Sequence, residues 1–273
     1  MSIKIIAFDL DGTFLYDDKS VPAENIRALR AAADQGAIIV PASGRTYTAM
    51  PPEITGLPGV RYFIGANGAE VYDAKENKCI YTANIPLSRA LEVYSYADGY
   101  PIYYDCYLGN RGYMTRYMYD DIQSIVDIPG ILHIIKTIRI PVDNLPDYLM
   151  ERGDDLQKVQ FYVRTPEEKA HIMAEMRELF PDLCVTSSLP MNIEINDHRA
   201  SKGQALAALC EHLGIDRSQS IAFGDGSNDT DMLVTAGIGV AMANAEDEVK
   251  AAADYITESN MDDGFAKALF KFL

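Results

Sequence analysis

Residues 3–13 read IKIIAFDLDGT, and this stretch decides the fold that we expect for the chain. The apolar run at residues 3–8 is short and rich in β-branched side chains, which is typical of a strand buried on both faces. Asp9 then lies at the carboxyl end of that strand, the edge at which open α/β sheets bind ligands. The stretch therefore predicts a ligand site close to the N-terminus.

Two carboxylates, Asp9 and Asp11, lie close together in this turn. Such a pair is costly unless a cation or a shared proton separates their charges. Gly12 permits a sharp turn and Thr13 adds a hydroxyl, so the segment looks like an oxygen-rich site for a hard cation such as Mg²⁺. An acidic turn that caps the first helix explains the same residues, and the segment alone leaves both interpretations open.

Length and composition restrict the class of protein. The chain has 273 residues, which favours two domains or one domain with a large insertion. Its formal net charge of -16 repels polyanions, so we expect neither a nucleic-acid partner nor a membrane partner. Four widely spaced cysteines predict reduced thiols rather than a zinc site, and no targeting or membrane-spanning pattern is present. We expect a cytoplasmic protein, either a monomer or a homodimer.

A βαβ unit follows the acidic turn. Pro22 lies near a helix start and Gly36 at the helix end, and residues 37–41 form a second apolar strand that runs into Ser43-Gly44-Arg45. A right-handed crossover brings Ser43 to the same sheet edge as Asp9. The hydroxyl, the backbone N–H and the guanidinium of this tripeptide suit a phosphate, although a plain turn explains a lone S-G-R equally well.

The middle of the chain has a different pattern of expected strands and helices. Residues 61–65 form a third strand, and residues 70–72 and 79–82 form a hairpin. From residue 84 to residue 190, Tyr-rich strands alternate with helices, which predicts an inserted α+β domain. We expect the chain to return to the first pattern at residues 192–195. The prediction is an α/β fold with a doubly wound, mainly parallel, Rossmann-like sheet built from residues 1–83 and 191–273, with the insertion at residues 84–190.

Two further segments carry candidate site residues. Lys202 follows Ser201 in the first turn of a helix, where a cation opposes the helix dipole by about 0.3–1 kcal/mol. Either an anion lies nearby, or Lys202 is a solvated surface residue. Residues 220–223 form a strand that ends in Gly224-Asp225-Gly226, so Asp225 can face Asp9 across a gap that Mg²⁺ could bridge. Neither acidic turn matches the pattern of a calcium-binding EF-hand loop, because Ser20 and Ala236 occupy the positions at which the loop requires its final Glu.

The order and content of these segments closely resemble the haloacid dehalogenase (HAD) superfamily of phosphatases. The motifs that carry the resemblance are Asp9 to Thr13, Ser43, Lys202, and Gly224-Asp225 with Asn228-Asp229. The insertion resembles the large cap of the Cof-type subclass IIB, of which Asn67-Gly68-Ala69 is also typical. The resemblance implies a cap that closes over the site and contacts the rest of the substrate.

The resemblance also implies a mechanism and a set of site residues. The expected enzyme is a Mg²⁺-dependent phosphomonoester hydrolase acting on a small phosphorylated metabolite, such as a sugar, cofactor or nucleotide phosphate. Asp9 would form an aspartyl-phosphate and Asp11 would serve as acid and then as base. The metal ligands would be Asp9, the Asp11 carbonyl and Asp225, with Asp229 orienting Lys202. The residues expected to bind phosphate are Thr13, Ser43, Gly44, Arg45, Lys202 and Asn228.

Two alternatives remain open at this point. A phosphomutase would use the same aspartyl-phosphate but return it to substrate. A non-enzymatic phosphate sensor would use the same pocket without turnover, although the paired Asp9 and Asp11 argue against it.

Overall fold

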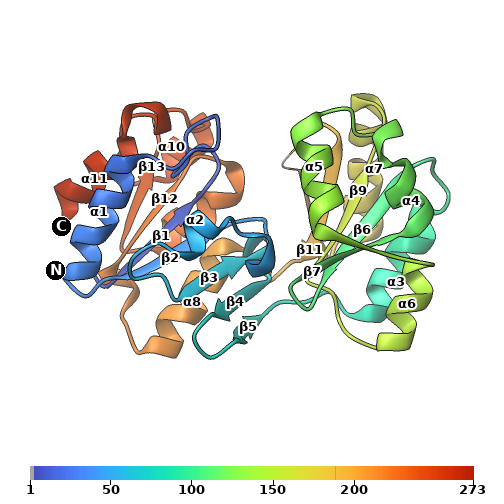
Figure 1. Cartoon of the computed structure of the whole chain (residues 1–273), viewed down its shortest axis with the longest axis horizontal. Coiled ribbons are helices and arrows are strands. Elements are labelled where there is room, and N and C mark those ends of the chain that lie inside the picture. The colour runs from blue at the N-terminus through green and yellow to red at the C-terminus, as the bar shows by residue number, and fades with distance from the viewer. Residues whose placement is uncertain (1–2, 188) are drawn as a thin grey trace. The chain divides into compact units, whose positions relative to one another are not determined.

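The computed structural model describes residues 3–187 and 189–273, and it divides the chain into two compact units. The core unit comprises Met1–Thr82 and Arg199–Leu273, and the inserted unit comprises Ala83–His198. In Figure 1 the core unit is drawn in blue to teal and in orange to red, and the inserted unit mainly in green to yellow. Among the described residues, no helix is both long enough and apolar enough to cross a membrane.

Among the described residues, the core unit forms an eight-stranded sheet. In spatial order its strands are β14 (Tyr255–Ile256), β13 (Ile238–Ala241), β12 (Ser220–Gly224), β1 (Ile5–Asp9), β2 (Ile38–Ala42), β3 (Tyr62–Gly65), β4 (Glu70–Asp73) and β5 (Lys78–Thr82). The strands from β14 to β3 are parallel, and β4 and β5 add an antiparallel hairpin at one edge. The predicted α/β fold with a mainly parallel sheet is confirmed.

Helices cover both faces of this sheet. The α-helices of the core unit are α1 (Ala23–Asp34), α2 (Pro52–Thr55), α8 (Lys202–Leu213), α9 (Thr230–Thr235), α10 (Asp247–Ala252) and α11 (Gly264–Phe272). Short 3₁₀ turns are η1 (Tyr47–Ala49), η2 (Ala66–Gly68), η4 (Arg217–Gln219), η5 (Ser227–Asp229) and η6 (Asn260–Asp262). Strand β1 lies between the two layers: Ile6 and Phe8 pack with Phe265 of α11, whereas Ile5 packs with Leu206 of α8. All five β1 residues are buried, as expected for a strand covered on both faces.

The inserted unit forms a six-stranded sheet within the described residues. In spatial order its strands are β10 (Leu183–Thr186), β11 (Asn192–Asp197), β9 (Lys158–Tyr162), β6 (Tyr103–Leu108), β7 (Arg111–Thr115) and β8 (Arg139–Val142). Only the β7 and β8 pair is parallel. The helices are α3 (Leu87–Ala97), α4 (Arg116–Asp121), η3 (Ile122–Ser124), α5 (Pro129–Ile138), α6 (Leu145–Arg152) and α7 (Pro166–Leu179).

One predicted boundary is wrong. We expected residues 192–195 to be the first strand of the returning core, with the core beginning again at residue 191. Instead β11 pairs antiparallel with β9 and β10, so the inserted unit extends to His198 and the core resumes at Arg199. The reason is the side-chain pattern of β11, in which Asn192, Glu194 and Asn196 alternate with isoleucines. That alternation gives one polar face and one apolar face, which suits an antiparallel sheet rather than a doubly covered parallel one.

Candidate active site

Asp9, Lys202 and Asp229 form a buried chain of charged groups at the carboxyl edge of the core sheet. Lys202 Nζ donates to Asp9 Oδ1 at 2.6 Å and to Asp229 Oδ1 at 2.5 Å. Ser201 caps helix α8 by accepting from the Gln204 N–H at 3.1 Å, which fixes the start of the helix and hence Lys202. Lys202 is fully buried, so a solvated surface lysine is ruled out, and its anionic partners are two carboxylates of the chain itself.

Burial has the largest single effect on the pKa values of Asp9 and Lys202. It raises the pKa of Asp9 to about 8, with Asp229 adding to the rise and Lys202 opposing it. Burial by itself would lower the pKa of Lys202, but the carboxylates of Asp229 and Asp9 outweigh it and raise that pKa. The two carboxylates therefore keep Lys202 charged, while burial makes ionisation of Asp9 less favourable even with Lys202 beside it.

Asp225 approaches the same place from the end of β12. Thr13 Oγ1 donates to Asp225 Oδ1 at 2.6 Å, so this buried hydroxyl orients the carboxylate. A Cβ added to Gly12 would lie 2.3 Å from Asp225 Oδ2, and Gly12 has a φ of +86°, so both space and backbone require glycine. Asp229 Oδ2 in turn accepts from the backbone N–H groups of Asp225 and Gly226 at 3.1 and 3.0 Å.

The carboxylates form a cluster that suits a hard divalent cation. One oxygen from each of Asp9, Asp225 and Asp229 lies within 4.8 Å of the other two. Burial raises the pKa of Asp225 to about 6, with the Thr13 hydrogen bond opposing the rise. Lys202 binds two of these carboxylates, and Asp225 binds the Thr13 hydroxyl instead, so the cluster favours a further cation. Its oxygen donors are those that Mg²⁺ prefers. The residues present therefore fit a magnesium ion.

Asp11 lies outside this cluster and has its own cationic partners. Lys19 Nζ lies 2.9 Å from Asp11 Oδ1, and Arg45 Nη2 lies 3.1 Å from Asp11 Oδ2. Burial of Asp11 works against ionisation, but Arg45 and Lys19 together lower its pKa. Arg45, which we expected to bind phosphate, thus contacts the expected acid/base. Lys19 itself has a φ of +68°, a left-handed conformation that is uncommon for lysine.

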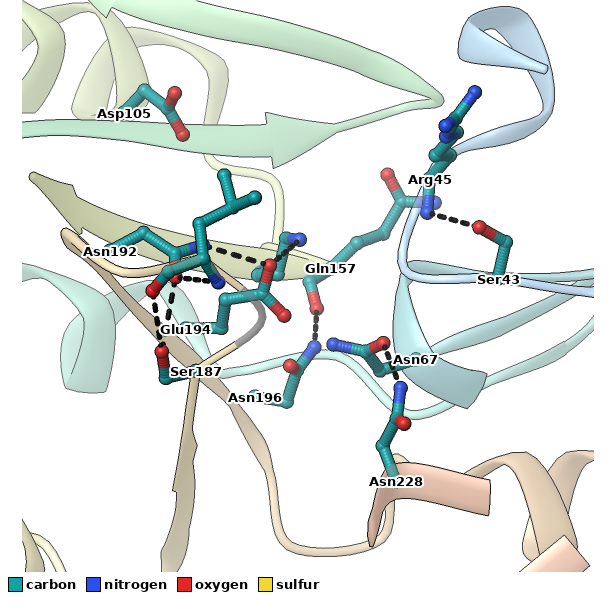
Figure 2. Close-up of polar contacts among 12 residues, drawn as sticks. Ser43, Arg45, Asn67, Asp105, Gln157, Ser187, Asn192, Glu194, Asn196 and Asn228 are labelled. Carbon is teal, nitrogen blue, oxygen red and sulfur yellow. Dashed lines mark hydrogen bonds and ion pairs between the residues drawn. The ribbon is translucent and has the colours of Figure 1, made fainter. Parts of the chain in front are cut away.

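The remaining predicted phosphate ligands lie in loops that meet beside this cluster. Ser43 is buried directly after β2, and its Oγ accepts from the Arg45 N–H at 3.3 Å (Figure 2). Asn228 Nδ2 donates to Asn67 Oδ1 at 3.5 Å, which links η5 to η2 (Figure 2). A Cβ on Gly44 would lie 2.9 Å from Asn67 Oδ1, so glycine lets these loops approach closely. The structure thus gathers the predicted residues of the core unit around one sheet edge.

Three residues near the site were not predicted. Lys19 gives no signal in the sequence beyond being a surface lysine. Asn244 Nδ2 donates to the Gly12 carbonyl at 2.8 Å and fixes the acidic turn; its place just after β13, at the same sheet edge, could have indicated this. Asp231 Oδ2 accepts from the Gly203 N–H at 3.0 Å and so ties the start of α8 to α9.

Comparison with known proteins places the chain in a family. A family model described as haloacid dehalogenase-like hydrolase matches residues 6–269, so the chain belongs to that family. It is 30% identical over 275 residues to 5-amino-6-(5-phospho-D-ribitylamino)uracil phosphatase YcsE of Bacillus subtilis (strain 168), an alignment covering 98% of this chain and 95% of that protein. It is 26% identical to pyridoxal phosphate phosphatase YbhA of Escherichia coli (strain K12), with all of both chains covered.

Solved structures agree with the sequence comparisons. A haloacid dehalogenase-like hydrolase from Bacteroides thetaiotaomicron matches with a TM-score of 0.84 at 26% identity, covering all of both chains. The HAD subclass IIB sugar phosphatase BT4131 matches with a TM-score of 0.81 at 25% identity, covering 98% of each chain. The chain is accordingly a phosphatase of HAD subclass IIB.

Proposed function

We propose that the chain is a Mg²⁺-dependent phosphomonoester hydrolase that acts on a small phosphorylated metabolite through an aspartyl-phosphate at Asp9. The observation that carries this proposal is the buried Asp9 carboxylate, held by Lys202 at 2.6 Å beside Asp225. A carboxylate at the open edge of a parallel sheet, next to a fixed cation, suits attack on a phosphoryl group.

Asp9 has to be ionised in order to act as the nucleophile. Burial raises its pKa to about 8, and Lys202 offsets only part of that rise. Asp9, Asp225 and the Asp11 carbonyl would hold a Mg²⁺ ion, whose charge would stabilise the Asp9 carboxylate and the oxygens of the transferring phosphoryl group. Thr13 would keep Asp225 oriented toward this ion, since its hydroxyl donates to that carboxylate. Its own role as a phosphate ligand stays a prediction.

Asp11 would protonate the leaving oxygen and then take a proton from the attacking water. Arg45 and Lys19 bind it in the structure and favour its anionic form. A phosphate group offers Arg45 a stronger bidentate partner than a half-exposed aspartate does. Substrate binding would therefore draw Arg45 from Asp11 to the phosphate, which raises the pKa of Asp11 and allows it to carry the proton.

Fixed donors would bind the transferring phosphoryl oxygens. Lys202 supplies a buried ammonium, Ser43 a hydroxyl at the end of β2, and Gly44 and Asn228 further N–H groups from loops at the same edge. The inserted unit would act as a cap that excludes water during the first step and contacts the leaving group. The relatives named for ribitylaminouracil, pyridoxal and sugar phosphatases support a small phosphorylated metabolite as the substrate.

Hydrolysis of p-nitrophenyl phosphate by the purified full chain tests this proposal. We expect phosphate release with Mg²⁺, its loss in EDTA, and a decrease of at least about 10³-fold for Asp9→Asn. The matched control is Asp34→Asn, which removes an exposed carboxylate at the end of α1 and should leave the rate unchanged. Metal-independent turnover, or an active Asp9→Asn variant with an unchanged circular dichroism spectrum, would contradict the proposal. Turnover of a sugar phosphate without release of inorganic phosphate would indicate a phosphomutase.

A further inference from the structure

Asparagine side chains from other parts of the core unit bind the backbone of the acidic turn that follows β1. Three of them donate through Nδ2 to three carbonyls of the turn: Asn244 to Gly12 at 2.8 Å, Asn25 to Phe14 at 2.9 Å and Asn260 to Leu15 at 3.0 Å. Carbonyls in a turn lie outside the ladders of the sheet, so side chains have to supply their partners where water is excluded. The conformation of the acidic turn thus depends on residues that are distant from it in the sequence.

The bond from Asn244 reaches the turn between two residues of the proposed chemistry. Asp11 precedes Gly12, and Thr13 follows it and donates to the Asp225 carboxylate at 2.6 Å. Glycine has more backbone freedom than any other residue, so the peptide groups beside Gly12 rotate easily unless they are held. Such a rotation would move both the Asp11 carbonyl and the Thr13 hydroxyl. By binding the Gly12 carbonyl, Asn244 restrains both neighbours.

The segment that carries Asn244 also binds the acidic turn after β12. Residues 242–246 follow β13, which lies beside β12 in the sheet (Figure 1). The Met242 N–H donates to the Gly224 carbonyl at 3.1 Å, and the Glu246 N–H donates to the Asp225 carbonyl at 3.3 Å. One short segment therefore contacts both of the turns that bring carboxylates to the site, and it fixes one turn relative to the other.

Asn260 fixes the orientation of the Asn244 amide. The backbone N–H of Asn260 donates to Asn244 Oδ1 at 3.0 Å, and with its oxygen held there the amide directs Nδ2 to the Gly12 carbonyl. Asn260 is buried, and its own Nδ2 donates both to the Leu15 carbonyl and to Asp17 Oδ1, the latter at 3.1 Å. The two asparagines are thus a connected pair that holds the acidic turn at two points.

Exposure separates a positioning role for Asn244 from a purely structural one. Asn244 is exposed, so water can replace its hydrogen bonds and their net contribution to stability is small. Asn25 makes bonds of the same kind, since it donates to the Phe14 carbonyl and accepts from the Ala266 N–H at 3.2 Å, but it is buried. Its loss leaves buried polar groups without a partner, which is costly. The two asparagines therefore bind the same turn with different expected consequences.

We propose that Asn244, oriented by the backbone N–H of Asn260, is a positioning residue that sets the placement of the two acidic turns relative to each other. It acts through the Gly12 carbonyl. The inference rests on the proposed Mg²⁺-dependent phosphatase function and extends it to residues outside the site motifs. Mg²⁺ demands nearly ideal octahedral geometry, so a small displacement of one turn should weaken its binding. The same displacement should slow turnover, because misplacing a reacting group by about 1 Å can cost about 10²-fold in rate.

The informative variant is Asn244→Ala, and the matched control is Asn25→Ala. Each removes an amide that accepts from one backbone N–H and donates to one carbonyl of the acidic turn. Three measurements are made on the full chain: the Kd for Mg²⁺ by isothermal titration calorimetry without substrate, kcat and KM for p-nitrophenyl phosphate at saturating Mg²⁺, and Tm.

We expect Asn244→Ala to raise the Kd for Mg²⁺ about tenfold and to lower kcat about tenfold, with KM within about twofold. Its Tm should fall by less than about 3 °C. Asn25→Ala should show the opposite pattern, with a larger fall in Tm but with kcat and the Kd for Mg²⁺ within about twofold of wild type.

The role of Asn260 is tested with proline, because the group that binds Asn244 is a backbone N–H. Asn260 is the first residue of η6, and Ser259 before it is extended, so proline fits at this position. Asn260→Ala removes the side chain and keeps the N–H, whereas Asn260→Pro removes both. We expect the Kd for Mg²⁺ of Asn260→Pro to be at least about threefold higher than that of Asn260→Ala. This difference should disappear in an Asn244→Ala background.

Two results would overturn the inference. In the first, Asn244→Ala has the kcat and the Kd for Mg²⁺ of wild type; in the second, Asn244→Ala and Asn25→Ala lose activity in proportion to their loss of Tm. A difference between Asn260→Pro and Asn260→Ala that persists without Asn244 would contradict the role of Asn260. All three outcomes leave the phosphatase proposal intact if the wild type hydrolyses p-nitrophenyl phosphate with Mg²⁺. Absence of that hydrolysis would contradict the phosphatase proposal itself.

Discussion

Lys202 Nζ lies 2.6 Å from Asp9 Oδ1, although 193 residues separate the two in the chain. The contact exists because β1 delivers Asp9 and helix α8 delivers Lys202 to the same edge of the core sheet. Lys202 also binds Asp229, so a single buried cation compensates two carboxylates. The chemistry that we propose depends on this shortage of positive charge, which a bound Mg²⁺ would relieve.

Replacing Lys202 with Met should impair both stability and activity. Removing one partner of a buried ion pair leaves the other charges uncompensated, which costs about 3–5 kcal/mol. We expect the free energy of unfolding in urea to fall by about that amount, and kcat/KM for p-nitrophenyl phosphate to fall at least about 10²-fold. Lys75→Met, which changes an exposed lysine of the β4–β5 turn, serves as the control. A Lys202→Met variant as stable and active as wild type would show that the buried pair contributes nothing.

The stability of the metal-free enzyme should decrease as the pH rises. The pKa of Asp9 is raised to about 8 and that of Asp225 to about 6, so the folded state holds protons that the unfolded state has released. Their contribution is fully present below the unfolded pKa of about 4 and is lost as the pH rises through about 6 to 8. Mg²⁺ competes with those protons and should raise the melting temperature more at about pH 8 than at about pH 6.

Differential scanning fluorimetry with and without Mg²⁺ measures this effect. Of these two carboxyl groups, Asp9 has the more strongly raised pKa. Asp9→Asn should therefore reduce the difference in Mg²⁺ stabilisation between about pH 8 and about pH 6. Equal Mg²⁺ stabilisation at both pH values in the wild type would argue against a metal held by Asp9 and Asp225.

Removing Lys19 should affect substrates according to their leaving group. Lys19 helps to lower the pKa of Asp11, so Lys19→Met should raise that pKa and keep Asp11 protonated to higher pH. The basic limb of the pH profile of kcat/KM should then shift upward for an alkyl phosphate, whose leaving oxygen needs a proton. p-Nitrophenyl phosphate has a good leaving group and should show no shift. A shift of the same size with both substrates would point to a structural effect rather than to Asp11.

Two glycines with nearly the same backbone conformation offer a test of the acidic turn. Gly12 has a φ of +86° and a Cβ there would lie 2.3 Å from Asp225 Oδ2, whereas Gly36 has a φ of +87° and no described atom within 4 Å. Gly36→Ala should cost roughly 1–2 kcal/mol for its left-handed backbone alone. Gly12→Ala should cost about 1–3 kcal/mol more because of the clash, and should weaken Mg²⁺ binding as well. Similar urea midpoints for the two variants would show that the acidic turn accommodates a Cβ at position 12 without a clash.

The sequence was enough to predict most of the core unit. The apolar run before Asp9, Pro22 at the start of α1 and Gly36 just after its end are local signals, and the structure reproduces them. The boundary at residue 191 was wrong because we read β11 as a buried parallel strand. Its alternation of Asn and Glu with Ile was the sign of a sheet with one polar face.

The site could be predicted only in part, for a physical reason. Asp9, Asp225 and Lys202 follow strand ends or start helices, so topology brings them together. The partners of Asp11 depend on how side chains bend within loops, which no periodic pattern encodes. Lys19 reaches Asp11 from a residue in a left-handed conformation, and the sequence contains no signal for that.

Trapping the covalent intermediate tests the central claim most directly. The Asp11→Asn variant should accumulate the aspartyl-phosphate, because it lacks the base that activates water for its hydrolysis. Borohydride reduces an acyl phosphate to the alcohol, which would convert the modified aspartate to homoserine. After incubation with p-nitrophenyl phosphate and Mg²⁺, peptide mass spectrometry should find homoserine at position 9 and nowhere else. Homoserine at another aspartate, or none in a sample that still turns over substrate, would contradict the assignment of Asp9 as the nucleophile.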